Sequence, residues 1–367
     1  MSETNKIGQS PERPFRICAN LNSRSFGDFI NGLLFTNTMA NHFDNHQTTI
    51  VYKNDAEFKR DLVKFVPGAN IIAIDENSIL PSLEMLNASA PVLWDQSFEE
   101  WFKLGLNQQD LLLTETMAAP PLLYRFDRIA HLEIPADISN SCKDMLISRG
   151  ISPDRWFCCV FCREPGYKYK PGGKNFRDAD PSVFIAATKH IIEQLGGQVV
   201  RLGHPQMTKF PDFDNFVDLS RDDDSHVLQS FAVSRSRFLL STPSGPGAIA
   251  YAFDVPTAYA NAVDMWCSSP KIIHRTVDVI TPDGAVINQQ EYKKRGLSKL
   301  KLLNLLNEKS DYRVVQNSAD IVKLLADAIF QSTKETLGWR TNTLGAEIFR
   351  PNQFVWPPNM ELTTRFL

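Results

Sequence analysis

Short apolar runs alternate along the first part of the chain with segments in which apolar residues recur at helical spacing. The runs predict buried β-strands, and the periodic segments predict helices packed against them. The expected strands are Phe15–Asn20, Thr48–Tyr52, Asn70–Ile74 and Pro91–Trp94, and the expected helices are Phe29–Phe43 and Glu57–Phe65. Strands that alternate with helices indicate βαβ units, and therefore a parallel sheet.

From Ser97 to about Arg149 the strand signal fades, and we expect this stretch to be helical and irregular. A domain boundary is placed near Asp144–Pro153, because the alternating pattern starts again directly afterwards. The strands expected there are Trp156–Cys162, Gln198–Leu202, Phe216–Leu219, Arg237–Leu240 and Pro256–Ala260, and the helices are Pro181–Leu195, Asp223–Val233, Gly247–Phe253 and Ser318–Ser332. Two successive α/β blocks predict two Rossmann-like domains facing a central cleft.

Length and composition agree with this organisation. With 367 residues the chain is longer than one core usually needs, and its 43% apolar and 22% charged residues are typical of a soluble globular protein. The net charge of −3 argues against a protein that grips nucleic acid through phosphates. We see no transmembrane span and no signal peptide, and the six cysteines form no disulfide framework, so we expect a cytoplasmic, reduced protein.

The loop between the first expected strand and helix carries a candidate catalytic residue, Asp28. Ligands of open α/β sheets bind at the carboxyl ends of the strands, so this loop is expected to face the cleft. Asp28 could act there as a general base. An Asp just before an apolar-periodic helix is also typical of an N-cap, and one residue can serve both purposes.

A basic and aromatic loop follows the first strand of the second block. Arg163 begins it, and Tyr167 and Lys168 follow within the sequence Arg-Glu-Pro-Gly-Tyr-Lys. Arg and Lys at the carboxyl end of a strand can bind a diphosphate, Arg in bidentate fashion. The alternative interpretation is a solvated basic loop without a ligand.

Small and hydroxyl-bearing residues precede a short helix of the second block. Among them Ser244, Gly245 and Gly247 are candidates for binding an anion, because a helix N-terminus presents backbone amides and a favourable dipole. The alternative interpretation is an ordinary tight turn.

The same segment, Gly245–Ala250, also fits the dinucleotide pattern G-x-G-x-x-A, with Asp264 about 20 residues further on. Pro246 removes an amide from such a loop, and the pattern lies late in the chain rather than at a first βα turn. We therefore treat a dinucleotide site as the less favoured interpretation.

No pattern of metal ligands stands out. Asp222 and Asp224 form D-x-D, but acidic residues more often simply occupy the first turn of a helix and complement its dipole. Cys159 and Cys162 form CxxC within an expected strand, where residues i and i+3 point to opposite faces and do not share one zinc. We expect both cysteines in the core and no metal in the site.

Among the seven histidines, His204 is a secondary site candidate, because it directly follows an expected strand. No G-x-S-x-G elbow and no phosphate-binding G-x-x-x-x-G-K-[ST] loop is present, which argues against hydrolase and kinase functions.

Segments of the second block resemble a family of bacterial glycosyltransferases found with surface-polysaccharide genes. The similar segments are Cys162–Tyr167, Asn175–Asp180, Gly196–Gly203, and Pro243–Gly245 followed by Ala250. They keep the order and spacing of the family over about Trp156–Val279. Asp28, in Phe-Gly-Asp, is similar in placement to the Asp that acts as base in the first loop of heptosyltransferases. Arg163 resembles the arginine that holds the donor diphosphate in fucosyltransferases. His204 departs from the family pattern, which often has Asp there, so no role is carried over to it.

The resemblance implies an α/β fold of the GT-B class. Residues 15–149, after a polar tail at 1–14, would then form the acceptor domain, and residues 150–335 the nucleotide-sugar domain. The C-terminal segment 336–367, which includes Trp339, would cross back to the first domain. The resemblance also implies inverting, metal-independent transfer with no cofactor beyond the nucleotide-sugar substrate.

Together with this resemblance, these patterns predict a glycosyltransferase that moves a sugar from a nucleotide-sugar to a glycan or lipid-linked acceptor. Asp28 would deprotonate the acceptor, and Arg163, Lys168 and the helix start at Ser244 would stabilise the leaving diphosphate. Nucleic acid is not an expected partner, and a lipid-linked acceptor leaves peripheral membrane association open. The alternatives are an NAD(P)-dependent oxidoreductase and a nucleotide- or sugar-binding protein without catalysis. The sequence does not specify the donor, the acceptor or the oligomeric state.

Overall fold

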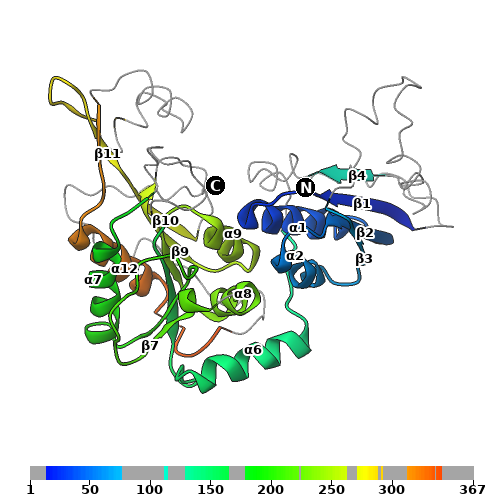
Figure 1. Ribbon diagram of the computed structural model, residues 1–367, viewed down its shortest axis with the longest axis horizontal. Helices are drawn as coiled ribbons and strands as arrows, with labels where there is room; N and C mark the ends of the chain where they lie inside the picture. Colours follow the sequence, from blue (N-terminus) through cyan, green and yellow to red (C-terminus); the bar gives the residue numbers. More distant parts are fainter. Residues whose placement is uncertain are drawn as a thin grey trace, which may run out of the picture. The chain divides into compact units, whose positions relative to one another are not determined.

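The computed structural model describes residues 14–76, 111–114, 129–164, 178–222, 225–262, 271–287, 291, 312–334 and 336–340. The chain divides into two compact units, Met1–Pro135 and Ala136–Leu367. Each unit contains a sheet of parallel strands with helices packed on it (Figure 1), as the alternating sequence pattern predicts.

The sheet of the first unit has the strand order β3-β2-β1-β4, with all neighbouring strands parallel. Its strands are β1 (Phe15–Leu21), β2 (His46–Lys53), β3 (Asn70–Ile74) and β4 (Leu111–Thr114). The central strand β1 is buried without interruption from Ile17 to Leu21, as expected for a parallel strand covered on both faces.

Three of these strands lie where the sequence predicts them, and β4 does not. The stretch after Ser97 was expected to be helical and irregular, and this prediction is wrong for β4. A short strand beside β1 is stabilised by pairing with that strand, so it needs no clear pattern of its own. The expected strand Pro91–Trp94 lies outside the described residues.

The helices of the first unit follow β1 and β2. Helix α1 spans Phe26–Ala40, and α2 spans Glu57–Leu62 and continues into the 3₁₀ turn Val63–Phe65. Helix α1 therefore begins about one turn earlier than the apolar periodicity predicts, because Gly27 and Asp28 interrupt the apolar pattern after Phe26.

The sheet of the second unit has the strand order β10-β9-β8-β5-β6-β7, again with all neighbours parallel. Its strands are β5 (Phe157–Phe161), β6 (Gln198–Arg201), β7 (Phe216–Asp218), β8 (Leu239–Ser241), β9 (Thr257–Ala262) and β10 (Ile272–Thr276). The chain runs from β5 outward to β7 and then returns to the other side of β5 at β8. This order is that of a doubly wound Rossmann-type sheet.

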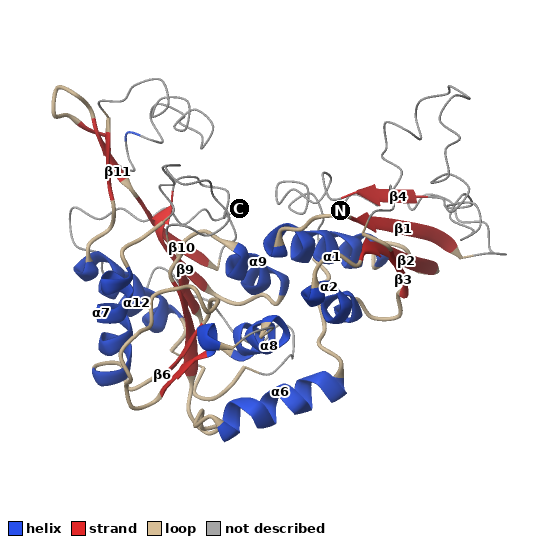
Figure 2. Cartoon of the chain, viewed as in Figure 1, coloured by secondary structure: helices blue, strands red, loops and turns tan. Residues whose placement is uncertain are grey.

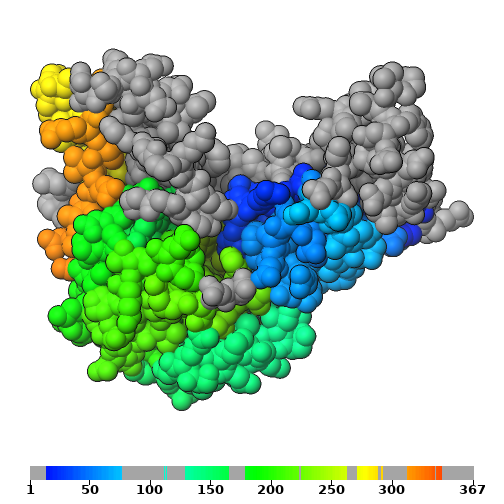
Figure 3. Space-filling model, viewed as in Figure 1, coloured from blue at the N-terminus to red at the C-terminus, as the bar shows by residue number. Residues whose placement is uncertain are grey.

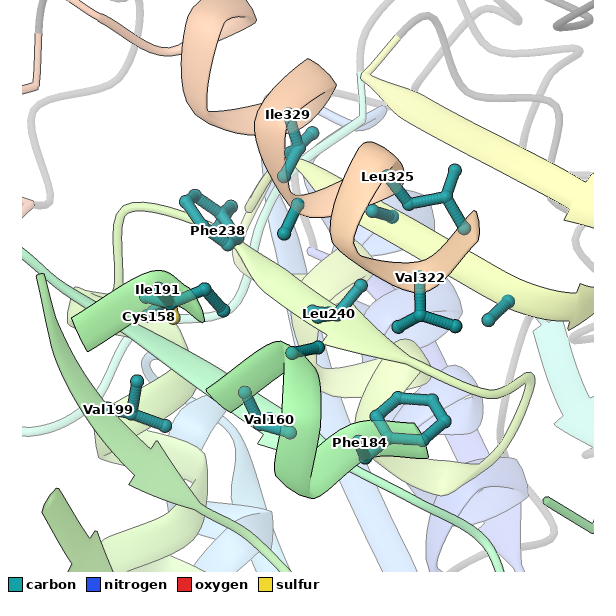
Figure 4. Close-up of a cluster of buried hydrophobic side chains, with 14 of the residues drawn as sticks. Cys158, Val160, Phe184, Ile191, Val199, Phe238, Leu240, Val322, Leu325 and Ile329 are labelled. Atoms are coloured by element: carbon teal, nitrogen blue, oxygen red, sulfur yellow. The ribbon is translucent and has the colours of Figure 1, made fainter. Parts of the chain in front are cut away.

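Helices cover both faces of this second sheet (Figure 2). Helices α7 (Pro181–Glu193) and α12 (Ala319–Ser332) pack side by side on one face, and α8 (His226–Arg235) and α9 (Gly245–Ala252) pack on the other. Figure 4 shows the core under α7 and α12, where Phe184 and Leu325 meet the strand residues Val160 and Leu240. Burial of this apolar layer holds the carboxyl ends of the strands in place.

The cysteines of β5 belong to the core, as predicted. Cys158 and Cys162 face the layer under α7 and α12, whereas Cys159 is buried outside that cluster. Cys159 and Cys162 therefore lie on opposite faces and do not form a shared zinc site. Burial raises the pKa of all three thiols, which keeps them protonated and unreactive.

Beyond β9 the second unit contains strands that the sequence did not indicate. They are β10 and the antiparallel sheet β12-β11-β13, formed by β11 (Asp278–Ile280), β12 (Val286–Ile287) and β13 (Arg313–Val315). Strands β11, β12 and β13 have only two or three residues, too few for a recognisable alternation, and β10 is an edge strand whose sequence, Ile-Ile-His-Arg-Thr, does not alternate regularly.

The first helix of the second unit lies on its surface, and a tryptophan near the last described residue packs back onto the start of the same unit. Helix α6 (Ala136–Ser148) is mostly exposed and forms the blue-green ridge in Figure 3, with Cys142 and Leu146 turned inward. Near the other end, the Trp339 indole donates a hydrogen bond to the Ser152 carbonyl at 2.9 Å, within the same unit. The chain after residue 340 lies outside the described residues, so the predicted crossing to the first domain stays a prediction.

Among the described residues, no helix combines the length and the apolar character that crossing a membrane requires.

Candidate functional site

The order in which the chain adds strands to the second sheet reverses between β5 and β8, which makes this position the switch point of the sheet. Ligands of doubly wound sheets bind at the carboxyl ends of the strands at the switch point. Arg163 follows β5 there, and Thr242 follows β8. The Arg163 backbone amide donates a hydrogen bond to the Thr242 hydroxyl at 3.0 Å, and both residues are buried. Two of the segments singled out in the sequence are thus joined directly.

The Arg163 side chain is paired within the unit. Its Nε donates to Asp178 Oδ1 at 2.9 Å, and the Arg163 carbonyl accepts from the Ala179 amide at 2.8 Å. An anion that binds Arg163 would therefore share the guanidinium with Asp178. This carboxylate was not among the predicted site residues, and nothing in the local pattern marked it as the partner of Arg163.

Tyr167 and Lys168, the other predicted donor-binding residues of this loop, lie outside the described residues.

The N-terminus of α9 lies beside Thr242. Ser244 is its N-cap residue and makes no side-chain cap hydrogen bond, Gly245 is its first residue, and Pro246 contributes no amide hydrogen. The Gly247 amide donates to the Ser244 carbonyl at 3.0 Å, so this amide already serves the turn. The helix dipole remains directed at the end of the sheet, where it favours a negative charge.

Gly247 has a packing role. A Cβ at this position would lie 1.9 Å from the Tyr259 hydroxyl of β9, far inside any contact distance. Glycine is therefore needed here for the close approach of α9 to the sheet, whether or not a ligand binds nearby.

A second polar cluster joins the ends of β5, β6 and β7. Arg201, almost completely buried, bridges Glu164 at 3.2 Å and Asp218 at 3.0 Å, and its guanidinium lies 3.8 Å from the ring centroid of Phe210. Glu164 also accepts hydrogen bonds from the Thr208 amide and hydroxyl at 2.8 and 2.6 Å. No local sequence pattern marks this network, because its members come from four separate segments.

The loop after β6 is held firmly at this cluster. Gln229 accepts from the Gly203 amide at 3.0 Å and donates to the Gly203 carbonyl at 2.8 Å. Gly203 has a φ of 154°, and a Cβ there would meet the Met207 sulfur at 2.7 Å. Arg221 donates to the carbonyls of Pro205 and Met207. The loop therefore has one well-defined shape.

This loop carries His204. Its Nδ1 accepts from the Gln206 amide at 3.3 Å, which leaves the proton of the neutral ring on Nε2. Burial lowers the pKa of His204; Glu164 opposes this shift, and Arg221 and Arg201 add to it. His204 is thus a neutral side chain at pH 7 beside a charged network.

In the first unit, Asp28 lies in the first turn of α1 and is exposed. The helix begins at Phe26 with Ser25 as its N-cap residue, so the alternative interpretation of Asp28 as the N-cap is wrong. A carboxylate in the first turn still interacts favourably with the helix dipole. Asp28 is therefore not needed as a cap and is presented to solvent beyond the carboxyl end of β1.

The first aspartate of the D-x-D pattern is engaged in an ion pair. Asp222 forms an ion pair with Arg149 on the surface of the second unit, and Asp224 lies outside the described residues. Within the part of the chain that the structure describes, no three His, Cys, Asp or Glu side chains group together as metal ligands.

No family model matches the sequence, and no curated protein matches it in sequence. In structure the chain is similar to a glycosyl transferase family 9 protein from Veillonella parvula, with a TM-score of 0.55 and 14% identity over 90% of this chain and 100% of that one.

Two weaker similarities are to Escherichia coli proteins. One is to ADP-heptose lps heptosyltransferase II, with a TM-score of 0.46 and 12% identity over 80% of this chain and 98% of that one. The other is to heptosyltransferase WaaC with ADP-2-deoxy-2-fluoro heptose, with a TM-score of 0.44 and 11% identity over 80% and 99%. The resemblance of the Arg-Glu-Pro-Gly-Tyr segment to a bacterial polysaccharide family stays a prediction. The similarity to the Veillonella protein confirms the predicted fold class, α/β of the GT-B type.

Proposed function

We propose that the protein is a glycosyltransferase that moves a sugar from a nucleotide-sugar donor to a glycan or lipid-linked acceptor. The observation that carries this proposal is the hydrogen bond from the Arg163 amide to the Thr242 hydroxyl at the switch point of the second sheet. It occurs in a chain with the fold of a glycosyl transferase family 9 protein.

The donor diphosphate would bind at the carboxyl ends of β5 and β8. A leaving diphosphate gains negative charge as its bond to the sugar breaks, and catalysis requires groups that stabilise this charge. The Arg163 guanidinium and the N-terminus of α9 at Ser244 and Gly245 provide positive potential at this point. Tyr167 and Lys168 extend the same segment in the sequence.

The acceptor hydroxyl would be deprotonated by Asp28. Its oxygen attacks the anomeric carbon, the bond from that carbon to the diphosphate breaks, and the diphosphate leaves with the bonding electrons. The proton of the hydroxyl passes to the Asp28 carboxylate, so a single displacement inverts the anomeric carbon. No residue of the chain is bonded to the sugar in this scheme.

A nicotinamide-dependent oxidoreductase is less well supported. The segment Gly245–Ala250 follows β8, which is not the first strand of its sheet, and the Gly247 amide is bonded within the turn. A binding protein without catalysis would retain donor binding and lack transfer.

Ligand binding followed by turnover tests the proposal. Thermal shift of the full chain against UDP-, GDP-, CMP- and ADP-sugars and NAD(P) should select one nucleotide-sugar, because ligand at about 100 times Kd adds about 2.7 kcal/mol of stability. Transfer or slow hydrolysis of that donor should then be measurable. Stabilisation by NAD(P) alone contradicts the proposal, and binding without any turnover supports the binding protein.

Arg163→Ala should weaken the shift produced by the selected donor. Arg155→Ala is the matched control, since Arg155 precedes β5 at the opposite edge of the sheet and bonds Asn215 at 2.8 Å. Equal donor affinity in both variants would remove Arg163 from the site.

Metal independence is part of the same proposal. Turnover should persist in EDTA, because the charge on the leaving group is met by protein groups. Complete loss on chelation, restored by Mn²⁺ or Mg²⁺, would overturn this part and make Asp222 and Asp224 candidate ligands.

A further inference from the structure

A buried carboxylate lies at the carboxyl end of the first sheet. Asp55 follows β2, and its side chain is 2% exposed. One of its oxygens, Oδ1, lies 2.7 Å from Nζ of Lys59, which is completely buried. The other oxygen, Oδ2, accepts a hydrogen bond at 3.0 Å from Nε of Arg24, whose side chain is 76% exposed.

Sheet register explains how residues from two loops meet. Strands β1 and β2 are parallel neighbours, and Leu21 is paired with Tyr52. Arg24 and Asp55 lie equally far along the chain beyond these two paired residues. The Asp55 carboxylate therefore links the β1–α1 loop to the start of α2.

Stability alone does not account for this ion pair. Two buried charges lose their hydration, and well-packed apolar residues of similar volume are often equally or more stabilising. The Lys59 ammonium lies 5.3 Å from the ring centroid of Phe29, so an aromatic side chain rather than water faces it on that side. Burial acts to raise the pKa of Asp55, but the interactions with Lys59 and Arg24 outweigh it and hold this pKa below its ordinary value. The carboxyl group therefore stays ionised and continues to hold both cations.

The loop attached to this pair continues into the first turn of α1. Within it the Ser25 amide donates to the Ser23 hydroxyl at 3.0 Å, and the ring of Phe26 meets that of Phe58 on α2 at a centroid distance of 5.4 Å. Arg24 and Phe26 thus connect the loop to two neighbouring positions, Asp55 and α2. Asp28 follows directly in the same turn.

We propose that Asp55 and Lys59 are positioning residues, which hold Arg24 and with it the β1–α1 loop so that Asp28 meets the acceptor in a single orientation. This inference rests on the proposed function, in which Asp28 is the base. Lys59 neutralises the charge of the buried Asp55 carboxylate, and Arg24 attaches the β1–α1 loop to that carboxylate. A misplacement of a reacting group by about 1 Å can cost about 100-fold in rate, so such a support has a measurable effect.

The test separates positioning from stability. The double variant Asp55→Leu/Lys59→Met replaces the ion pair with apolar groups and should fold with a Tm near that of the wild type. Its kcat at saturating donor and acceptor should nevertheless fall about 10-fold to 100-fold, with donor KM unchanged. A kcat within two-fold of the wild type would show that the pair serves stability only and would overturn the proposal.

An exposed pair provides the matched control. Asp61 and Lys64 form an ion pair at the same distance, 2.7 Å, near the end of α2, with both side chains nearly half exposed. Asp61→Leu/Lys64→Met should leave kcat unchanged. If the buried double variant fails to fold, Arg24→Met removes the exposed partner of Asp55 and should produce the same loss of kcat.

A measurement without turnover distinguishes this inference from the proposed function. Hydrogen exchange of the amides between residues 22 and 28 should accelerate in Asp55→Leu/Lys59→Met and in Arg24→Met, and should not change in the control. Unchanged exchange would overturn the positioning role even in an active enzyme. If the wild-type protein transfers no sugar while amide exchange is accelerated in these variants, the result contradicts the proposed function alone.

Discussion

The Arg163 amide and the Thr242 hydroxyl share a hydrogen bond of 3.0 Å that joins the ends of β5 and β8. The two strands are neighbours in the sheet, although Pro181–Glu193 and much other structure lies between them in the chain. Together with the pairing of β5 and β8, the bond fixes the loop of Arg163 beside the N-terminus of α9. The bond is thus one of the contacts that hold the two candidate diphosphate-binding elements next to each other.

Thr242→Val removes the acceptor and keeps the shape of the side chain. The buried Arg163 amide then has no partner there, which costs about 1–3 kcal/mol of unfolding free energy. Thr242→Ser retains the hydroxyl and should be closer to the wild type. Urea unfolding of the three proteins measures the difference. A valine variant as stable as the wild type would mean that the bond contributes nothing to the fold.

Gly247→Ala should be destabilising whether or not a ligand binds, because the new Cβ would lie 1.9 Å from the Tyr259 hydroxyl. Overpacking of this kind costs about 1–3 kcal/mol. Tyr259→Phe removes the nearest atom, so the double variant should recover part of the loss relative to Tyr259→Phe alone. Thermal unfolding provides the double-mutant cycle. Full additivity of the two substitutions would contradict the packing role.

Asp28→Asn separates the roles of the first turn of α1. Loss of the charge removes about 0.3–1 kcal/mol of interaction with the helix dipole. If Asp28 is the base, kcat should fall about 10² to 10⁴-fold, because an amide does not accept the proton. Asp137→Asn is the control, since Asp137 is an exposed acidic residue in the first turn of α6. Similar kcat in both variants would end the assignment of Asp28 as base.

His204 should make the fold less stable toward acid. Burial lowers its pKa, while the ordinary value, reached in the unfolded chain, is about 6.5. As the pH falls through about 6.5, the unfolded chain binds a proton at this histidine before the folded protein does. The free energy of unfolding therefore declines between about pH 6.5 and the lower pKa of the folded state, and His204 has no effect on it at higher pH. Tm measured between about pH 8 and about pH 5 should therefore fall more steeply in the wild type than in His204→Gln. Parallel curves would show that His204 does not contribute.

The predicted elements that the structure confirms are those with a strong local pattern. Asn70–Ile74 is predicted to the residue, and Pro181 and Gly196 mark the start of α7 and the turn after it as expected. The sequence did not predict β4 and β10 to β13: β4 and β11 to β13 have only two to four residues, and β10 is a five-residue edge strand without regular alternation. The sequence places Asp28 near the start of a helix, and the structure agrees. Whether Asp28 is the N-cap or lies inside the first turn depends on the residue at which the α1 hydrogen bonds begin.

Local order along the chain was sufficient for the α/β class, for placing Arg163 and Ser244 just after strands, and for placing Asp28 near a helix start, because apolar periodicity and turn residues act over a few positions. The charge partners depended on folding. Asp55 reaches Arg24 only because the neighbouring parallel strands β1 and β2 place their loops at one edge of the sheet, and Asp178 reaches Arg163 only because the two ends of the β5–α7 connection meet in the fold. No local pattern carries that information, since the paired residues are 15 and 31 positions apart in the chain.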